Sequence, residues 1–306
     1  LGMFGNPLED QEMDRQTLQG WKDCIDNAHH FGATCVAGFT GRVRGKPLTE
    51  SLPAYRTLWS ELARRAADKG VRIAFENCAM EGNWQTGDWN IAHNPDAWEL
   101  IFNETPDDHI GLEWEPCHQM VYLIDPIPQI RKWAHKFFHV HGKDATIRWD
   151  VIREHGIFGR EKFVFMRTPG FGDSNWTDII SELRLAGWSG SIDIEGWHDP
   201  VYRDALEMTG QVHALNYLKQ ARGGEFIDEA LADQGGCEGA SGLDQDAVGT
   251  ALAAVTRATL GELAIDHPDL SPPAGQRQLP ATGDAPQPDA AVRFARRGQP
   301  LFFESP

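Results

Sequence analysis

Short apolar runs alternate with longer amphipathic stretches over the first 224 residues of the 306-residue chain. Leu18, Trp21, Ile25 and Ala28 recur at helical spacing on one face, which predicts the first helix. Strands are expected at 1–5, 33–39, 71–77, 109–115, 137–143, 163–167 and 191–195. Helices are expected between them, at about 10–30, 53–69, 94–104, 125–136, 174–186 and 201–220. Asn94 and Pro95 are a typical helix start, because Asn can cap free amides and Pro suits the first turn.

Strands that alternate with helices indicate parallel strands with helical crossovers, in a barrel or in an open doubly wound sheet. An open sheet concentrates its site at one switch point, and no glycine-rich phosphate loop follows an early strand here. Residues with catalytic potential stand at the ends of several strands, which favours an α/β TIM (β/α)8-type barrel. The chain opens at Leu1 in a strand already in progress, so we expect that the first β/α unit is missing.

The composition changes after Gly224, since all eleven Trp lie before it. Residues 225–306 carry thirteen Asp and Glu against five Arg, with no Lys. One helix is expected at 246–263, and 268–306 has too little apolar material to offset chain ordering. We therefore expect two parts, a barrel at 1–224 and a largely disordered acidic tail at 225–306. A foreign extension from a fused or frame-shifted reading is favoured over a regulatory appendage.

The formal net charge of -17 disfavours nucleic acid and anionic membranes as partners. No apolar run reaches the length of a membrane span, so none is expected, and the first residues do not have the pattern of a signal peptide. The cysteines are odd in number and form no CxxC pair, so a reducing cytoplasm is expected. They are Cys24, Cys35, Cys78, Cys117 and Cys237.

Four predicted strands end in a carboxylate or an imidazole. Glu76 ends one strand, Glu115 and His118 follow a second, His141 lies near the end of a third, and Glu195 ends a fourth. In a barrel these ends meet at one mouth, so the residues are the ingredients of one metal site. The alternative for each Glu is a bridge to a basic residue of a neighbouring strand.

The motifs at these ends resemble a known family. They are AFEN at 74–77, WEPCH at 114–118, HVHGKD at 139–144, PGFGD at 169–173 with Trp176, and IE at 194–195. In this order they resemble the sugar phosphate isomerase/epimerase group of the xylose isomerase-like TIM barrel superfamily, which also includes endonuclease IV. The resemblance covers residues 1–224.

The resemblance implies that Glu76, Glu115, His141 and Glu195 hold one divalent ion. The group usually has Asp at the second position, and Glu113 is an alternative ligand there. Oxygen-rich ligation with one imidazole suits Mn²⁺, Mg²⁺ or Co²⁺, and Zn²⁺ is also possible. His139 is expected to be structural and to point away from His141, and a salt-bridged rim is the alternative role for Lys143 and Asp144.

The resemblance further implies a metal-dependent sugar isomerase or epimerase that works through an enediolate, with Glu76 and Glu195 as acid/base residues. A lyase of the inosose dehydratase type is the close alternative, because it uses the same site. A DNA repair enzyme like endonuclease IV is less favoured, since that site needs three metals and many more His ligands. A non-catalytic binder is a further alternative.

The implied substrate contacts are His118, Arg167, Trp114 and Asn77. Trp84 and Trp197 are further candidates for a wall against the sugar, and core packing is the alternative role for every Trp. The expected partner is a small carbohydrate, with a homo-oligomer possible and with neither nucleic acid nor membrane.

Overall fold

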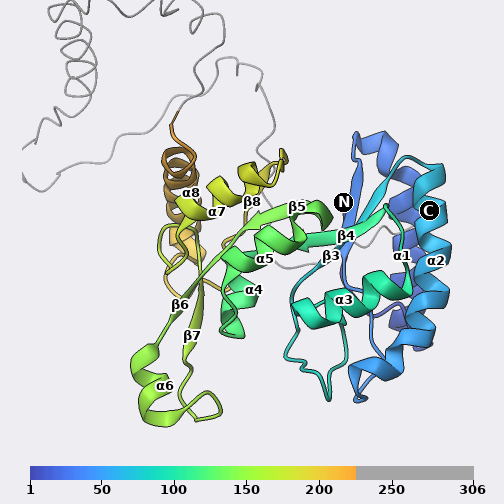
Figure 1. Ribbon diagram of the computed structural model, residues 1–306, viewed down its shortest axis with the longest axis horizontal. Helices are drawn as coiled ribbons and strands as arrows, with labels where there is room; N and C mark the ends of the chain where they lie inside the picture. The colour runs from blue at the N-terminus through green and yellow to red at the C-terminus, as the bar shows by residue number, and fades with distance from the viewer. Residues whose placement is uncertain (225–306) are drawn as a thin grey trace, which may run out of the picture. The chain divides into compact units, whose positions relative to one another are not determined.

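The computed structural model describes residues 1–224. The expected helix at 246–263 and the rest of the acidic tail lie outside the described residues. Six parallel strands form one curled sheet, open on one side like part of a barrel (Figure 1). In spatial order they are β1 (Gly2–Met3), β2 (Cys35–Gly38), β3 (Arg72–Glu76), β4 (Ile110–Trp114), β5 (Phe137–Gly142) and β8 (Ile192–Ile194).

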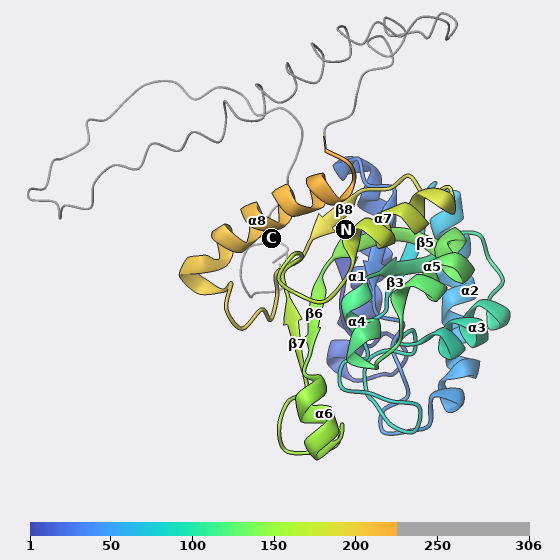
Figure 2. The ribbon, with the colours of Figure 1, turned by 60° about the vertical axis from the view of Figure 1, so that its left-hand side comes forward.

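Helices alternate with the strands along the chain, and most of them lie against the main sheet, as Figure 2 shows from a second side. They are α1 (Glu12–Asn27), α2 (Leu52–Asp68), α3 (Pro95–Glu104), α4 (Pro116–Val121), α5 (Pro126–Trp133), α6 (Trp149–His155), α7 (Trp176–Leu185) and α8 (Glu207–Ala221). Short 3₁₀ turns occur at η1 (Ala28–Phe31), η2 (Leu48–Ser51), η3 (Ala134–Lys136) and η4 (Asp204–Leu206). Within residues 1–224, no helix combines the length and the apolar character that a bilayer crossing requires.

Local sequence explains where the helices begin. The side chain of Asn94 accepts a hydrogen bond from the backbone N–H of Ala97, and Pro95 is the first residue of α3, as predicted. Helix α5 starts in the same way, with the Asp125 carboxylate accepting from the Ile127 N–H at 2.9 Å. Helix α4 was not predicted, because its six residues are too few to show a period.

The prediction that residues 163–167 form a strand of the barrel is wrong, because this strand pairs elsewhere. Strand β7 (Val164–Arg167) pairs antiparallel with β6 (Asp144–Ile147), in a separate two-stranded sheet. Helix α6, which connects them, projects with the hairpin away from the main sheet (Figure 1). Its only buried side chain is Val151, so it lacks the apolar face with which a crossover helix covers a sheet.

The core lies between the first strands and the helices that cover them. Trp59 of α2 is fully buried, with its ring 4.9 Å from Trp21 and 4.6 Å from Phe75, centroid to centroid. Its indole N–H donates to the carbonyl of Thr40 at 2.9 Å, which satisfies the one polar atom of the side chain. This packing holds β3 in place, and with it the residues that follow at its carboxyl end.

Candidate metal centre

The four predicted ligands lie at one edge of the main sheet. Glu76 is the last residue of β3, Glu115 follows β4 directly, His141 lies in β5, and Glu195 follows β8. The strands are parallel, so their carboxyl ends share this edge.

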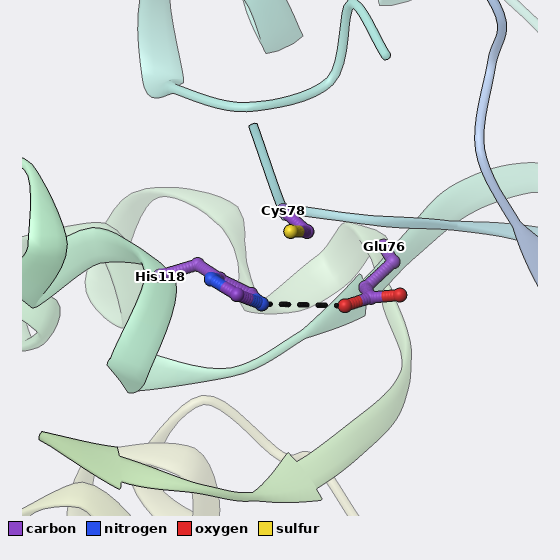
Figure 3. A group of neighbouring side chains, drawn as sticks. All are labelled: Glu76, Cys78 and His118. Atoms are coloured by element: carbon purple, nitrogen blue, oxygen red, sulfur yellow. Dashed lines mark ion pairs between the residues drawn. The ribbon is translucent and has the colours of Figure 1, made fainter. Parts of the chain in front are cut away.

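The structure divides these residues between two neighbouring clusters. Glu115, His141 and Glu195 each offer a ligand atom, and the three atoms lie within 4.8 Å of one another. Glu76 instead groups with Cys78 and His118 (Figure 3). His118 links the two clusters, since its Nε2 lies 3.3 Å from Glu76 Oε1 and also contacts Glu115 Oε1.

Lys143, for which a rim position was the alternative, lies inside the site. Lys143 is only 2% exposed, and its ammonium donates to Glu195 Oε1 at 2.6 Å and lies 3.7 Å from Glu115 Oε1. The signal for this placement is the strand period, because residues 139, 141 and 143 point to the same face of an extended chain. Lys143 therefore partly balances the charge of the carboxylates.

The buried charges determine the protonation states in the cluster. Burial raises the pKa of Glu115, but the nearby charges of His118 and Lys143 outweigh it and hold that pKa well below its usual value. Burial lowers the pKa values of His118 and Lys143, yet the Glu115 carboxylate raises both well above their usual values. Glu115 is thus ionised, and its negative charge already holds the two cationic side chains of His118 and Lys143.

Several buried polar atoms of the site make no regular hydrogen bond among the described residues and lie only in ion-pair contact with one another. They include both carboxylate oxygens of Glu115, Nε2 of His118 and Nδ1 of His141. Such atoms are rare in folded proteins, and a bound ion is one way to satisfy them. Carboxylate oxygens and imidazole nitrogens are also donors that Mn²⁺, Zn²⁺ and Co²⁺ accept. The residues present therefore fit a divalent cation.

The imidazole of His141 lies among three carboxylates. Its Nε2 is 3.1 Å from Glu113 Oε1, and its Nδ1 is 3.2 Å from Glu195 Oε2 and 3.6 Å from Glu115 Oε2. With a proton on Nε2 toward Glu113, Nδ1 offers its lone pair toward Glu115 and Glu195. This arrangement favours a role for Glu113 in orienting the ring of His141. It disfavours the alternative, in which Glu113 is itself a metal ligand beside Glu115.

The expectation that His139 points away from His141 is wrong. The two rings lie 5.1 Å apart, and His139 Nε2 is 4.0 Å from the same Glu113 carboxylate. Residues two apart in a strand share a face, which the expectation overlooked. Glu113, His139 and His141 form a third group of mutually close ligand atoms.

The other predicted contact residues lie at varied depth. Asn77 is fully buried, and its amide donates to the Glu115 carbonyl at 2.9 Å and accepts from the Glu115 N–H at 3.0 Å. Trp114 is also fully buried and stacks on Phe137, which favours the core-packing alternative. Arg167 lies on β7, where its Nε is 3.3 Å from an Asp199 carboxylate oxygen.

Comparisons with known proteins point to one family. An inosose dehydratase of Clostridium beijerinckii is 26% identical over 172 residues, which cover 54% of this chain and 52% of the relative. The chain thus spans about half the length of that curated relative.

Two solved structures share the fold. One is a D-tagatose 3-epimerase-like protein, with a TM-score of 0.53, 18% identity, and coverage of 77% of this chain and 79% of the other. The second is the IolI protein with a bound zinc atom, with a TM-score of 0.52, 20% identity, and coverage of 72% of each chain. Residues 2–221 match the family model described as xylose isomerase-like TIM barrel, and the chain belongs to this family.

Proposed function

We propose that the chain is a divalent-metal-dependent enzyme that moves a proton at a carbon next to the carbonyl of a sugar. The observation that carries the proposal is the convergence of Glu115, His141 and Glu195, whose ligand atoms lie within 4.8 Å of one another at the carboxyl ends of the strands. Glu76 lies beside them through His118 and completes the proposed ligand set.

A divalent ion held by these four side chains would supply Lewis-acid chemistry, polarising a substrate carbonyl so that the adjacent C–H becomes more acidic. We propose Mn²⁺, Mg²⁺ or Co²⁺ for this position, with Zn²⁺ as a further candidate. The zinc atom of the structurally similar IolI protein supports a metal, although at 20% identity the likeness extends to the fold alone.

The proton transfers are assigned to Glu195 and Glu76. Glu195 follows β8 and Glu76 is the last residue of β3, and β4 and β5 lie between those strands, so the two groups flank the Glu115 and His141 positions from different directions. The Lys143 ammonium donates to Glu195 Oε1 at 2.6 Å and holds this side chain in position, and we assign Glu195 the removal of the proton. Glu76 then returns a proton on the other side of the substrate.

The predicted contact residues divide by their positions. His118 lies within the site at 4% exposure, and we propose that it holds a substrate oxygen. Arg167 is proposed to hold a hydroxyl or phosphate group. We propose that Asn77 and Trp114 hold Glu115 in place and do not contact the substrate. Asn77 forms two hydrogen bonds with the backbone of Glu115, and Trp114 is the buried residue just before it.

Isomerisation or epimerisation is the first proposed outcome, and dehydration is a comparable second. The inosose dehydratase similarity favours dehydration, and the epimerase-like fold favours proton return. Both outcomes begin with removal of the same proton. They differ in whether a proton returns to carbon or a neighbouring hydroxyl leaves.

Incubation of the metal-loaded full chain with ketoses and inososes in D₂O tests the proposal. Deuterium should enter one carbon of the recovered sugar if a proton returns, whereas a dehydrated product identifies the lyase. Glu195→Gln should lower either rate about 10²–10⁴-fold, which is typical of losing a general base. The control Glu99→Gln changes a 59%-exposed carboxylate on α3 and should keep the native rate. A near-native rate in Glu195→Gln would remove Glu195 from the mechanism.

A further inference from the structure

A cavity lies at the amino ends of the strands, at the edge of the main sheet opposite the candidate metal centre. Its volume is about 360 Å³, near the lower end of the range of roughly 300–1,000 Å³ that is usual for small-molecule sites. Arg72, the first residue of β3, and Phe137, the first residue of β5, line it together with the segment 186–190 before β8. Glu76 lies at the other end of β3, roughly 13 Å away along an extended chain, so a ligand in this cavity does not reach the metal centre.

The cavity contains a guanidinium group that is held by its face. Arg72 Cζ lies 4.5 Å from the ring centroid of Phe138. Strand β4 separates their strands, and a Cβ on its residue Gly111 would lie 2.7 Å from the Phe138 ring. A side chain at position 111 would therefore displace the ring. Within residues 1–224 no carboxylate forms an ion pair with Arg72, and a guanidinium stacked by its face keeps the N–H groups of its edge free to donate.

The segment 186–190 adds neutral donors to the wall. The backbone N–H groups of Ser189 and Gly190 have no protein acceptor in the described part of the chain. The indole N–H of Trp188 donates to the Phe137 carbonyl at 2.9 Å, which ties this segment to β5. A Cβ on Gly190 would lie 2.4 Å from the Trp188 ring, so the chain folds closely around the indole. The segment is therefore ordered before any ligand arrives, which lowers the cost of binding.

The charge of the wall selects the kind of ligand. No Asp or Glu is among the described residues that line the cavity, although the chain has 45 acidic residues and a net charge of -17. The ionisable side chains of the wall are those of Arg72 and His135. A wall that carries a cation and N–H donors, and no carboxylate, attracts an oxyanion and disfavours a metal ion.

We propose that this cavity binds the phosphate group of a small ligand. The edge of the Arg72 guanidinium matches two phosphate oxygens at once, and the N–H groups of the 186–190 segment and the imidazole of His135 are donors for the remaining oxygens. A carboxylate has only two oxygens and leaves these further donors unused. The site goes beyond the proposed function, because it involves none of the proposed metal ligands and does not depend on the reaction that the chain catalyses.

Calorimetric titration of the full chain with inorganic phosphate, in a chelator that removes metal-bound phosphate, tests the site. The native chain should bind phosphate, and acetate should bind at least tenfold more weakly. Arg72→Gln should weaken phosphate binding about 10–100-fold, because it removes charge-assisted hydrogen bonds. Arg72→Lys keeps the charge but not the planar fork and should lose less. The matched control Arg64→Gln changes an exposed arginine of α2 and should keep the native affinity.

Four outcomes would overturn the site. They are absence of phosphate binding in the native chain, native affinity in Arg72→Gln, equal affinities for acetate and phosphate, and loss of phosphate binding in Arg167→Gln. The last result would place the ion at the proposed substrate contact instead of this cavity. Phosphate binding that depends on Arg72, together with absence of deuterium exchange, would reject the proposed function and leave this site standing.

Discussion

We distinguish a first side of the structure, with strands β3 and β4, from a second side, with β8 and the β6–β7 hairpin, and the two differ in how deeply they bury their strands. On the first side every residue of β3 and β4 is buried, except Arg72 at the start of β3. On the second side β8 has no buried residue, and the β6–β7 hairpin leaves most of β7 partly exposed. The candidate metal centre lies across this boundary.

The difference suggests a division of roles between the carboxylates. Glu115, on the first side, has a fully buried side chain, and Asn77 clamps its backbone. The side chain of Glu195, on the second side, is 27% exposed. A buried and fixed carboxylate is suited to bind a metal ion permanently. A partly exposed carboxylate can exchange protons with a substrate. The following changes test that contrast, from the largest expected effect to the smallest.

Trp59→Ala should cost about 3–5 kcal/mol of unfolding free energy, because it empties a large volume in the buried side. The matched change Ile192→Ala in β8 should cost only about 1 kcal/mol, since Ile192 is already partly exposed. Urea denaturation of the two variants and the native chain measures both values. Equal costs would show that the two sides do not differ in packing.

Asn77→Ala should cost about 2–3 kcal/mol, because it leaves the N–H and the carbonyl of Glu115 without their partners in a buried place. The comparison variant is Asn175→Ala, which removes an exposed helix cap and should cost about 1 kcal/mol. Denaturation midpoints measure the costs, and metal titration should show a weaker site in Asn77→Ala alone. Unchanged metal affinity would mean that Asn77 does not position Glu115.

Glu113→Leu should weaken metal binding about 10–100-fold, because His141 loses the acceptor that orients its ring. Glu113→Gln keeps an oxygen acceptor of the same reach and should lose less. Equilibrium dialysis against Mn²⁺ compares the two variants with the native chain. Similar losses in both would indicate that the charge of Glu113 matters more than its hydrogen bond.

His93 should make the protein less stable in mild acid. Burial, aided by the charge of Arg42, lowers the pKa of His93 from 6.5 to about 4. The unfolded chain therefore binds this proton first, so stability is complete above pH 6.5 and falls as the pH drops from 6.5 toward 4, by about 1 kcal/mol per pH unit.

His93→Leu should remove this part of the pH dependence, and denaturation at pH 5.5 and pH 8 measures it. The stability difference between the variant and the native chain should be constant above pH 6.5 and should shift in favour of the variant below it. A constant difference across the whole range would show that His93 does not titrate on unfolding.

Much of the framework was predictable because its signals are local. Helix α3 begins after Asn94 as expected, since a cap and a proline act on adjacent backbone groups. The parallel order of the main sheet follows from strands separated by crossover helices. The strand at 163–167 was placed in the wrong sheet, because pairing depends on whether a distant helix can cover it.

By itself the sequence determined the order of the main-sheet strands, helix starts such as that of α3, and which carboxylates and imidazoles stand at the strand ends. The tertiary structure alone decided that Glu76 groups with Cys78 and His118, that Lys143 lies among the carboxylates, and that Glu113 backs His141. The physical reason is the separation along the chain over which each kind of interaction acts. Capping and periodicity act between residues a few positions apart, whereas the partners of a charged group depend on the lateral register of strands far apart in the chain.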